Sequence, residues 1–214
     1  MSKNSAGPAL FKFGSKGHME DLVKNGHLYM QALAYFVRLE SDDLRSDPNE
    51  ALGRVLLSPG CEMDVQLEAR WESIGTLASS LTQRDSALEK ANVFCMFGLV
   101  PTAAGKLIHE DNLRFGDTYV VFLDPNEFLR RVEDEVRKRG LKAQSGQVEY
   151  VDEGTYTGEM GAFRKFSRFE YQSEYRIVLS PGTAKPYSLH IGDLSDIAAM
   201  GPLAELNKRL RVNP

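Results

Sequence analysis

A segment near the C-terminus constrains the fold most, because its side chains alternate between polar and apolar. Residues 163–179 read FRKFSRFEYQSEYRIVL. Successive side chains of a strand point to opposite faces. One face would carry mainly apolar groups: Phe169, Tyr171, Ser173, Tyr175, Ile177 and Leu179. The other would carry a polar row: Glu170, Gln172, Glu174 and Arg176. The pattern predicts a strand over 171–179 with one face in the core.

The polar row has two interpretations. A half-exposed antiparallel strand shows the same alternation when its polar face simply meets water. The functional interpretation rests on Gln172 and Glu174, an amide and a carboxylate two residues apart on one face. Arg176 follows on the same face, where a guanidinium can orient the carboxylate and keep it ionised. Glu174 is therefore the first candidate for a catalytic carboxylate.

The rest of the chain is strand-rich with scattered helices, without a regular alternation of the two. The clearest helix follows Asp124, with Pro125 in its first turn, and ends at Gly140. Further helices are expected after Ser15, over 31–40 and over 203–210. Strands are expected over 10–13, 28–30, 54–57, 61–69, 93–100, 118–122, 148–151 and 187–191. This organisation favours the α+β class. We expect a flexible N-terminus over 1–8 and one domain over 9–214.

Composition excludes several classes of protein. The chain has 214 residues, which is ample for a hydrophobic core. Its net charge of −4 provides no global basic field for nucleic acid. No apolar run approaches the roughly 18 residues of a membrane helix, and residues 1–8 are too polar for a signal peptide. Two cysteines make no disulfide framework. We expect a cytoplasmic protein without a membrane partner.

Familiar catalytic and metal-binding motifs are missing. The run Gly14-Ser15-Lys16 lacks the rest of a phosphate-binding loop. The four histidines and two cysteines have no zinc-site spacing, so we predict no metal centre. A Cys–His nucleophile pair stays open. Cys95 lies in an apolar run, however, where a buried thiol is usually inert.

Two short motifs carry a resemblance to a known superfamily. Gln172-Ser173-Glu174 resembles the Gln/Glu-x-Glu signature on a late strand of ADP-ribosyltransferases, and 11–30 is similar to the start of bacterial members, including toxins that modify DNA or RNA. The chain also resembles a bacterial family with an early Asn-Asp-Pro-x-Glu and a late Glu-x-Glu-x-Arg motif. Here these read Ser46-Asp47-Pro48-Asn49-Glu50 and Gln172-Ser173-Glu174-Tyr175-Arg176, so Ser replaces Asn and Gln replaces Glu.

The resemblance implies a fold and an activity. The fold would be an ADP-ribosyltransferase-like mixed β core of two small sheets with peripheral helices. The activity would be NAD-dependent mono-ADP-ribosyl transfer to a macromolecule, with DNA or RNA as candidate acceptors. The setting would be conflict between bacteria and phage, with an antitoxin protein as a candidate partner. Glu174 would stabilise the oxocarbenium-like transition state. Gln172 would orient the acceptor or a ribose hydroxyl.

NAD, as the substrate, would need cationic and aromatic groups. For its pyrophosphate the candidates are Arg45, Arg38 and Lys12. Tyr29 and Tyr35 lie where the superfamily often has the ring that faces nicotinamide. Lys165, with Arg164 and Arg168, forms a basic cluster that could meet phosphates. Arg176 would hold the catalytic carboxylate. Surface ion pairing explains the arginines equally well.

Two other hypotheses stay open. The first is a module of the same fold that binds a nucleotide or a partner protein without turnover. The second is a metal-dependent nuclease or hydrolase that uses Asp47, Glu50 and Glu174 around a metal ion. Asp47 and Pro48 also form an ordinary turn or helix start.

Overall fold

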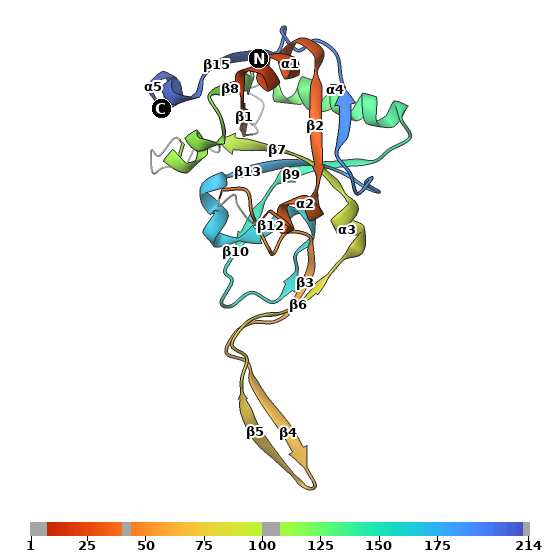
Figure 1. Cartoon of the computed structure of the whole chain (residues 1–214), viewed down its shortest axis with the longest axis vertical. Coiled ribbons are helices and arrows are strands. Elements are labelled where there is room, and N and C mark those ends of the chain that lie inside the picture. The colour runs from red at the N-terminus through yellow and green to blue at the C-terminus, as the bar shows by residue number, and fades with distance from the viewer. Residues whose placement is uncertain (1–7, 40–43, 100–107, 212–214) are drawn as a thin grey trace, which may run out of the picture.

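The computed structural model describes residues 8–39, 44–99 and 108–211. The predicted flexible N-terminus lies, except for Pro8, outside the described residues. The described part mixes helices with strands in four sheets of eight, three, two and two strands. The coarse α+β prediction is therefore confirmed, whereas the prediction of two small sheets is wrong, because a protruding hairpin and a short strand pair form sheets of their own (Figure 1).

The largest sheet is built around β7 (Asn92–Leu99), whose sequence NVFCMFGL is apolar enough to be covered on both faces. β13 (Glu174–Leu179) pairs along one edge of β7, and β9 (Ala143–Gln147) continues beyond it. The opposite edge is shared by β1 (Ala9–Gly14) near Phe97 and by β2 (His27–Ala32) at Asn92 and Val93. All these pairs are antiparallel. Beyond them lie β8 (Thr118–Phe122), β15 (Ala198–Pro202) and β14 (Tyr187–His190).

One face of this sheet is covered by the two longest helices, α1 (Lys16–Asn25) and α4 (Pro125–Lys138). The start of α4 is as predicted, since the Asp124 carboxylate accepts the backbone N–H of Glu127 at 3.0 Å. Gly140 follows in the left-handed conformation, with φ of 68°. The helices and sheet share the main core, which includes Leu22, Phe94, Val120, Phe128, Val132 and Ile177.

The other face carries shorter elements. These are α2 (Leu33–Val37), α3 (Ser86–Lys90), η2 (Gly161–Phe163), β12 (Arg164–Phe166) and η3 (Ser167–Gln172), with β10 (Glu149–Val151) pairing parallel to β12. A second core joins them to the sheet through Leu33, Ala51, Val93, Ala162 and Val178. The helix predicted over 31–40 is shorter because β2 extends to Ala32. Its last residue, Glu40, lies outside the described part.

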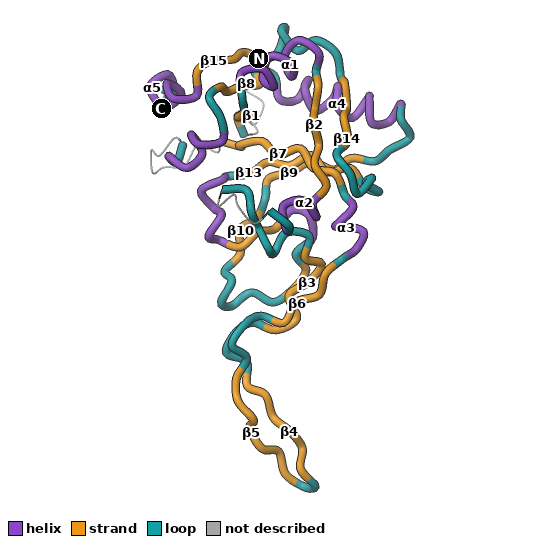
Figure 2. Tube along the Cα trace, in the orientation of Figure 1, coloured by secondary structure: helices purple, strands orange, loops and turns teal. Residues whose placement is uncertain are grey.

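A long hairpin extends from the body as an arm (Figures 1 and 2). At its base β3 (Leu52–Leu57) pairs with β6 (Leu81–Arg84) and with the short β11 (Gly158–Glu159). Further out β4 (Glu62–Leu67) pairs with β5 (Arg70–Thr76). The sequence pattern predicts β4 and part of β3 but not β5. The last elements of the described part are η4 (Leu203–Glu205) and α5 (Leu206–Arg209), and η1 (Glu110–Phe115) precedes β8.

The predicted strand over 171–179 begins only at Glu174. Residues 167–172 form the 3-10 helix η3, and Ser173 adopts the left-handed conformation with φ of 39°. The Ser173 hydroxyl and its backbone carbonyl are both tied to Gly98 on β7, at 2.7 Å each. These bonds hold a turn where the sequence pattern indicates continued extension. No helix in the described part is long and apolar enough to cross a membrane.

Candidate functional site

The two faces of β13 meet different surroundings. Tyr175, Ile177 and Leu179 point toward α4 and the main core, as the alternating pattern predicts. Glu174 and Arg176 point the other way, beneath η2, β12 and the turn around Glu50. The prediction of a polar row on this strand is confirmed for these two residues. The face is closed rather than open to solvent, however, because Glu174 is 7% exposed and Arg176 only 1%.

Arg176 is the centre of this buried group. Its Nη1 and Nη2 atoms donate to both carboxylate oxygens of Glu50, at 2.8 and 2.6 Å. Its Nε donates to Glu174 Oε1 at 2.9 Å, and Nη1 also bonds the Ala162 carbonyl at 2.7 Å. The guanidinium thus makes a bidentate ion pair with Glu50 and a further bond to Glu174. Bidentate pairing with a carboxylate is among the strongest interactions of arginine. As placed, Arg176 orients Glu174, as expected, but does not face a phosphate site.

Lys165 of β12 is the second buried cation. Its Nζ donates to Gln172 Oε1 at 2.9 Å and lies 3.5 Å from Glu174 Oε2. It lies 3.7 and 3.8 Å from the carboxylates of Asp47 and Glu50. Its other side faces the ring of Phe169, with Nζ 4.5 Å from the ring centre. We call Asp47, Glu50, Lys165, Gln172, Glu174 and Arg176 the buried ionic cluster.

The early and late motifs meet in this cluster. Asp47 Oδ1 accepts the backbone N–H of Asn49 at 2.9 Å, and the Glu50 N–H bonds the Asp47 carbonyl at 3.0 Å. The ordinary prediction of a turn at Asp47-Pro48 is therefore confirmed. That same turn places both acidic side chains over β13, where they are 2% and 3% exposed. The sequence predicts these two residues as part of a metal site or of a turn, not as partners of Lys165 and Arg176.

The charges of the cluster are set by mutual pairing. Burial by itself would raise the pKa of Glu174, but Arg176 and Lys165 outweigh it and hold that pKa well below its usual range. Burial would lower the pKa of Lys165, yet the Glu174 and Glu50 carboxylates raise it. Asp47 differs, since burial raises its pKa and Lys165 only partly offsets the shift. Glu174 is thus a fixed, ionised carboxylate in a place of low exposure.

Gln172 reaches the cluster from η3 rather than from the strand. Its Oε1 accepts from Lys165, and its Nε2 donates to the Leu44 carbonyl at 3.0 Å. The expectation that Gln172 and Glu174 lie on one strand face is wrong, because Ser173 turns the chain between them. The two side chains are nevertheless joined through the ammonium of Lys165. Gln172 also links the late motif to the segment that follows α2.

Two further candidates for NAD ligands are Lys12 and Arg45. Lys12 of β1 donates to the Cys95 carbonyl at 2.6 Å and lies over the Phe94 ring. Burial lowers the pKa of Lys12, and Cys95 and Glu174 partly offset that shift. Arg45 is exposed and donates to the Phe115 carbonyl at 3.5 Å. Burial strongly raises the pKa of the Cys95 thiol, consistent with an inert cysteine.

The other candidates lie apart from Glu174 or at the surface. Tyr29 of β2 is 52% exposed and makes an edge contact with the ring of His27. It pairs with Ser188 of β14. Tyr35 and Arg38 are exposed in and just after α2. Tyr35 makes an edge contact with Phe36, whose carbonyl accepts the Asp47 N–H.

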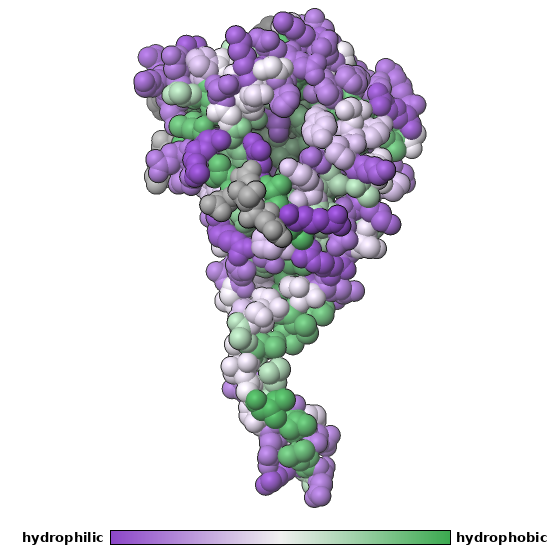
Figure 3. Space-filling model, in the orientation of Figure 1, coloured by the Kyte–Doolittle hydropathy of each residue, from purple (hydrophilic) through white to green (hydrophobic). Residues whose placement is uncertain are grey.

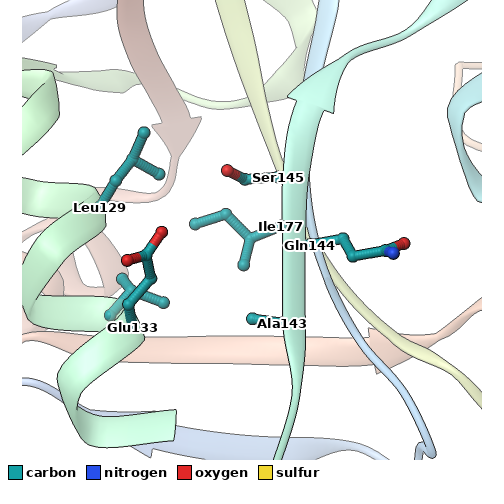
Figure 4. Close-up of a pocket in the computed structure, with 7 residues that line it drawn as sticks. Leu129, Glu133, Ala143, Gln144, Ser145 and Ile177 are labelled. Carbon is teal, nitrogen blue, oxygen red and sulfur yellow. The ribbon is translucent and has the colours of Figure 1, made fainter. Parts of the chain in front are cut away.

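A shallow hollow lies on the opposite side of β13. It is lined by Leu129, Val132, Glu133, Ala143, Gln144, Ser145 and Ile177, between α4 and β9 (Figure 4). Ile177 and Glu174 differ by an odd number of strand positions, so their side chains point to opposite faces. The hollow is therefore not an entrance to Glu174.

The cluster is not arranged as a metal centre. Asp47, Glu50 and Glu174 do come together, as the hydrolase hypothesis requires, but the Lys165 ammonium lies between them. Across the described residues, no group of three His, Cys, Asp or Glu side chains is placed to hold a metal ion. Two protein cations occupy the positions where a divalent ion would bind the carboxylates.

The chain was compared with protein families, curated proteins and solved structures. No family model, no curated protein and no solved structure matches the chain.

Replacing Asp47 with asparagine should stabilise the protein by about 0.5–2 kcal/mol at pH 7. The pKa of Asp47 is raised by burial, so the charged form is disfavoured in the folded state. The raised pKa means that protonated Asp47 favours the folded state. This contribution is fully present below the pKa of Asp47 in the unfolded chain, and it is lost as the pH rises through the pKa of Asp47 in the folded chain. Asparagine stays neutral at every pH, so the folded state no longer loses stability as the pH rises. Its side-chain oxygen can still accept the bond from the Asn49 N–H. Urea unfolding at pH 7 and at about pH 3, where both chains are neutral at this position, measures the difference.

The matched control is Asp152→Asn. Asp152 accepts the Gly154 N–H at 3.0 Å in a similar turn but is exposed. Its substitution should change the unfolding free energy little at either pH. Equal effects of the two substitutions, or destabilisation by Asp47→Asn at pH 7, would contradict the burial argument.

Proposed function

We propose that the chain is an NAD-dependent mono-ADP-ribosyltransferase with Glu174 as its catalytic carboxylate and a macromolecule, DNA or RNA among the candidates, as acceptor. The observation that carries the proposal is the state of Glu174, which is ionised and oriented on β13 of the main sheet. Its Oε1 accepts a bond of 2.9 Å from Arg176 Nε. Such preorganisation is what stabilisation of a developing positive charge requires. The early and late motifs of the resemblance also meet beside Glu174, through the bond from Arg176 to Glu50, and this supports the proposal.

The chemistry assigns separate tasks to the neighbouring groups. As the bond from ribose to nicotinamide breaks, nicotinamide leaves with the bonding electrons and positive charge develops on the ribose carbon. Glu174 stabilises that charge, the acceptor nucleophile bonds to the carbon, and the proton of the nucleophile passes to water. Lys12 and Arg45 are the candidates for the pyrophosphate. Gln172 orients the acceptor or a ribose hydroxyl.

One oxygen of Glu174 is better placed than the other to receive a ribose. Oε1 is bound tightly by Arg176 Nε at 2.9 Å. Oε2 has longer contacts with these cations, 3.3 Å to Arg176 and 3.5 Å to Lys165. A ribose hydroxyl would therefore bond to Oε2 and displace Lys165, which would keep its shorter bond to Gln172. The role proposed for Gln172 thus includes holding Lys165 when substrate is bound.

A second function is favoured by a specific observation. Glu174 is 7% exposed and both of its oxygens already have partners. A buried, fully paired carboxylate is what a structural cluster contains. A module that binds a nucleotide or a partner protein without turnover fits this observation, with the cluster serving to join residues 47–50 to β13.

Incubation with labelled NAD and separate pools of DNA, RNA and protein tests the two functions. Incorporation of label into one pool, with release of nicotinamide, supports the transferase. No incorporation, together with a rise in melting temperature on addition of NAD or another nucleotide, supports the binding module. Absence of both contradicts both functions. A parallel nuclease assay with and without chelator tests the metal-dependent alternative.

A further inference from the structure

The arm is one continuous β ribbon from Leu52 to Arg84. Between its inner and outer halves the ladder continues through two bonds, from the Gly60 N–H to the Leu77 carbonyl at 2.8 Å and from the Leu77 N–H to the Cys61 carbonyl at 2.9 Å. β11 covers one edge at the base. Beyond Gly60, within the described residues, β4 and β5 pair only with each other. The outer arm therefore has two open edges and two open faces.

Exposed apolar side chains concentrate on this arm. Ten large hydrophobic side chains of the described part are exposed, and six of them belong to the ribbon: Leu56, Leu57, Leu67, Trp71, Ile74 and Leu81. Figure 3 shows apolar surface running along the arm from its neck. Each such side chain offers on the order of 100 Å², so the six offer on the order of 600 Å². Monomeric proteins seldom expose more than a few hundred Å² in one place.

A two-stranded ribbon of this kind needs support from outside. An isolated hairpin is marginally stable in water, and three or more strands or a packed face are needed for independent stability. The outer arm has no packed face within the described part of the chain. The exposed fractions of Trp71 and Ile74 are 66% and 63%. Both belong to β5, so β5 is the side of the arm where covering would stabilise most.

The charges of the arm differ between its strands. β4 carries Glu62 and Asp64 with no basic residue. β5 carries Arg70 and Glu72, which form an ion pair of 2.6 Å and leave that strand neutral. Acidic side chains on an edge strand discourage pairing, as edge protection does in many proteins. The acidic strand is thus protected, whereas the neutral strand with Trp71 and Ile74 is not.

We propose that the arm is a self-association surface, in which β5 packs against β5 of a second copy of this chain around a two-fold axis. This arrangement buries Trp71 and Ile74 of both copies and leaves the acidic β4 strands outermost. The same patch then serves both partners, as a two-fold interface requires. Trp71 and Ile74 together offer on the order of 200 Å² per copy, well below the roughly 800 Å² per partner of a standard interface, so the dimer is expected to be weak and reversible.

The charge of the arm argues against two other occupants. Residues 61–77 contain four acidic residues and one basic residue, a net charge of −3. Phosphates of nucleic acid and of anionic membranes are therefore repelled. A second copy brings the same net charge, but the two-fold arrangement separates the acidic strands. Added salt should then strengthen the dimer, because it screens the repulsion between the arms and leaves the apolar contact intact.

The purified protein allows a direct test, because Trp71 is the only tryptophan. Sedimentation equilibrium should give a monomer–dimer equilibrium with a dissociation constant below about 100 µM, tighter in added salt. Over the same concentration range the tryptophan emission should shift to the blue and become less accessible to acrylamide. A dimer whose Trp71 emission stays that of an exposed indole would place the interface elsewhere and overturn the proposal.

Three variants complete the test. Trp71→Ser with Ile74→Ser should weaken the dimer at least tenfold with unchanged circular dichroism. The control is Leu123→Ser, which removes an equally exposed leucine, 67% exposed, from the body and should leave the dimer intact. Replacing residues 62–76 with Asn-Gly closes the ladder between Cys61 and Leu77 and should give a monomer.

A wild-type chain that is monomeric well above about 100 µM would overturn the proposal, since no two-fold interface then forms at relevant strength. The same conclusion would follow if the Asn-Gly variant still dimerised, or if dimerisation weakened steeply with salt. The proposal is independent of the transferase activity, because every measurement reads mass or Trp71 rather than turnover.

Discussion

Replacing Glu50 with glutamine should lower the free energy of unfolding by about 3–5 kcal/mol, because it removes one charge of a buried ion pair. Glu50 receives both Nη atoms of Arg176, at 2.8 and 2.6 Å, in a place where it is 3% exposed. The amide keeps the shape of the side chain but removes its charge. Arg176 would then keep only the carboxylate of Glu174, and its burial would be poorly compensated. Urea unfolding at pH 7 measures the loss.

The matched control is Glu149→Gln. Glu149 also receives an arginine Nε, that of Arg164, at 2.7 Å, but it is 60% exposed. Surface pairs of this kind contribute about 0–1 kcal/mol. A loss from Glu50→Gln no larger than the loss from Glu149→Gln would mean that water compensates the charge of Arg176. The picture of a dry cluster joining the two motifs would then be wrong.

Local patterns predict the parts of this fold that local physics determines. α4 begins after Asp124 and β8 spans Thr118–Phe122 as expected, because a cap, a proline and an uninterrupted apolar run act within a few residues. β5 is missed because its sequence RWESIGT lacks strict alternation, and its register with β4 shifts near Met63. The start of β13 is misplaced because Ser173 is held in a left-handed turn by bonds to Gly98, far away in the sequence.

The candidate site shows the same division between local and distant causes. The sequence indicates that Glu174 and Arg176 share a strand face, and they do. It does not indicate that this face is closed, because the closing residues come from 47–50, more than a hundred positions earlier. A signal was nevertheless present. Asp47, Glu50 and Lys165 are charged residues near apolar runs, and buried charges occur where they can pair.

Replacing Glu174 with glutamine should abolish transfer of ADP-ribose, lowering the turnover rate on the order of 10²–10³-fold or more if the proposed function is right. The amide retains the shape of the side chain and its bonds to neighbouring donors in part, but it cannot stabilise the positive charge that develops on ribose. NAD binding should change much less, because the pyrophosphate contacts assigned to Lys12 and Arg45 are untouched. Initial rates at saturating labelled NAD, divided by the folded fraction, measure the effect.

Glu174→Gln will also destabilise the fold, since Glu174 pairs with Arg176 and Lys165. Two comparisons separate this from catalysis. Glu170→Gln changes an exposed carboxylate in η3 and should leave rate and stability as they are. Glu50→Gln disturbs the same cluster with a similar loss of stability but keeps the Glu174 carboxylate, so its rate per folded molecule should fall far less. If Glu50→Gln and Glu174→Gln lose equal activity per folded molecule, the cluster acts only as a structural support, and Glu174 is not the catalytic residue.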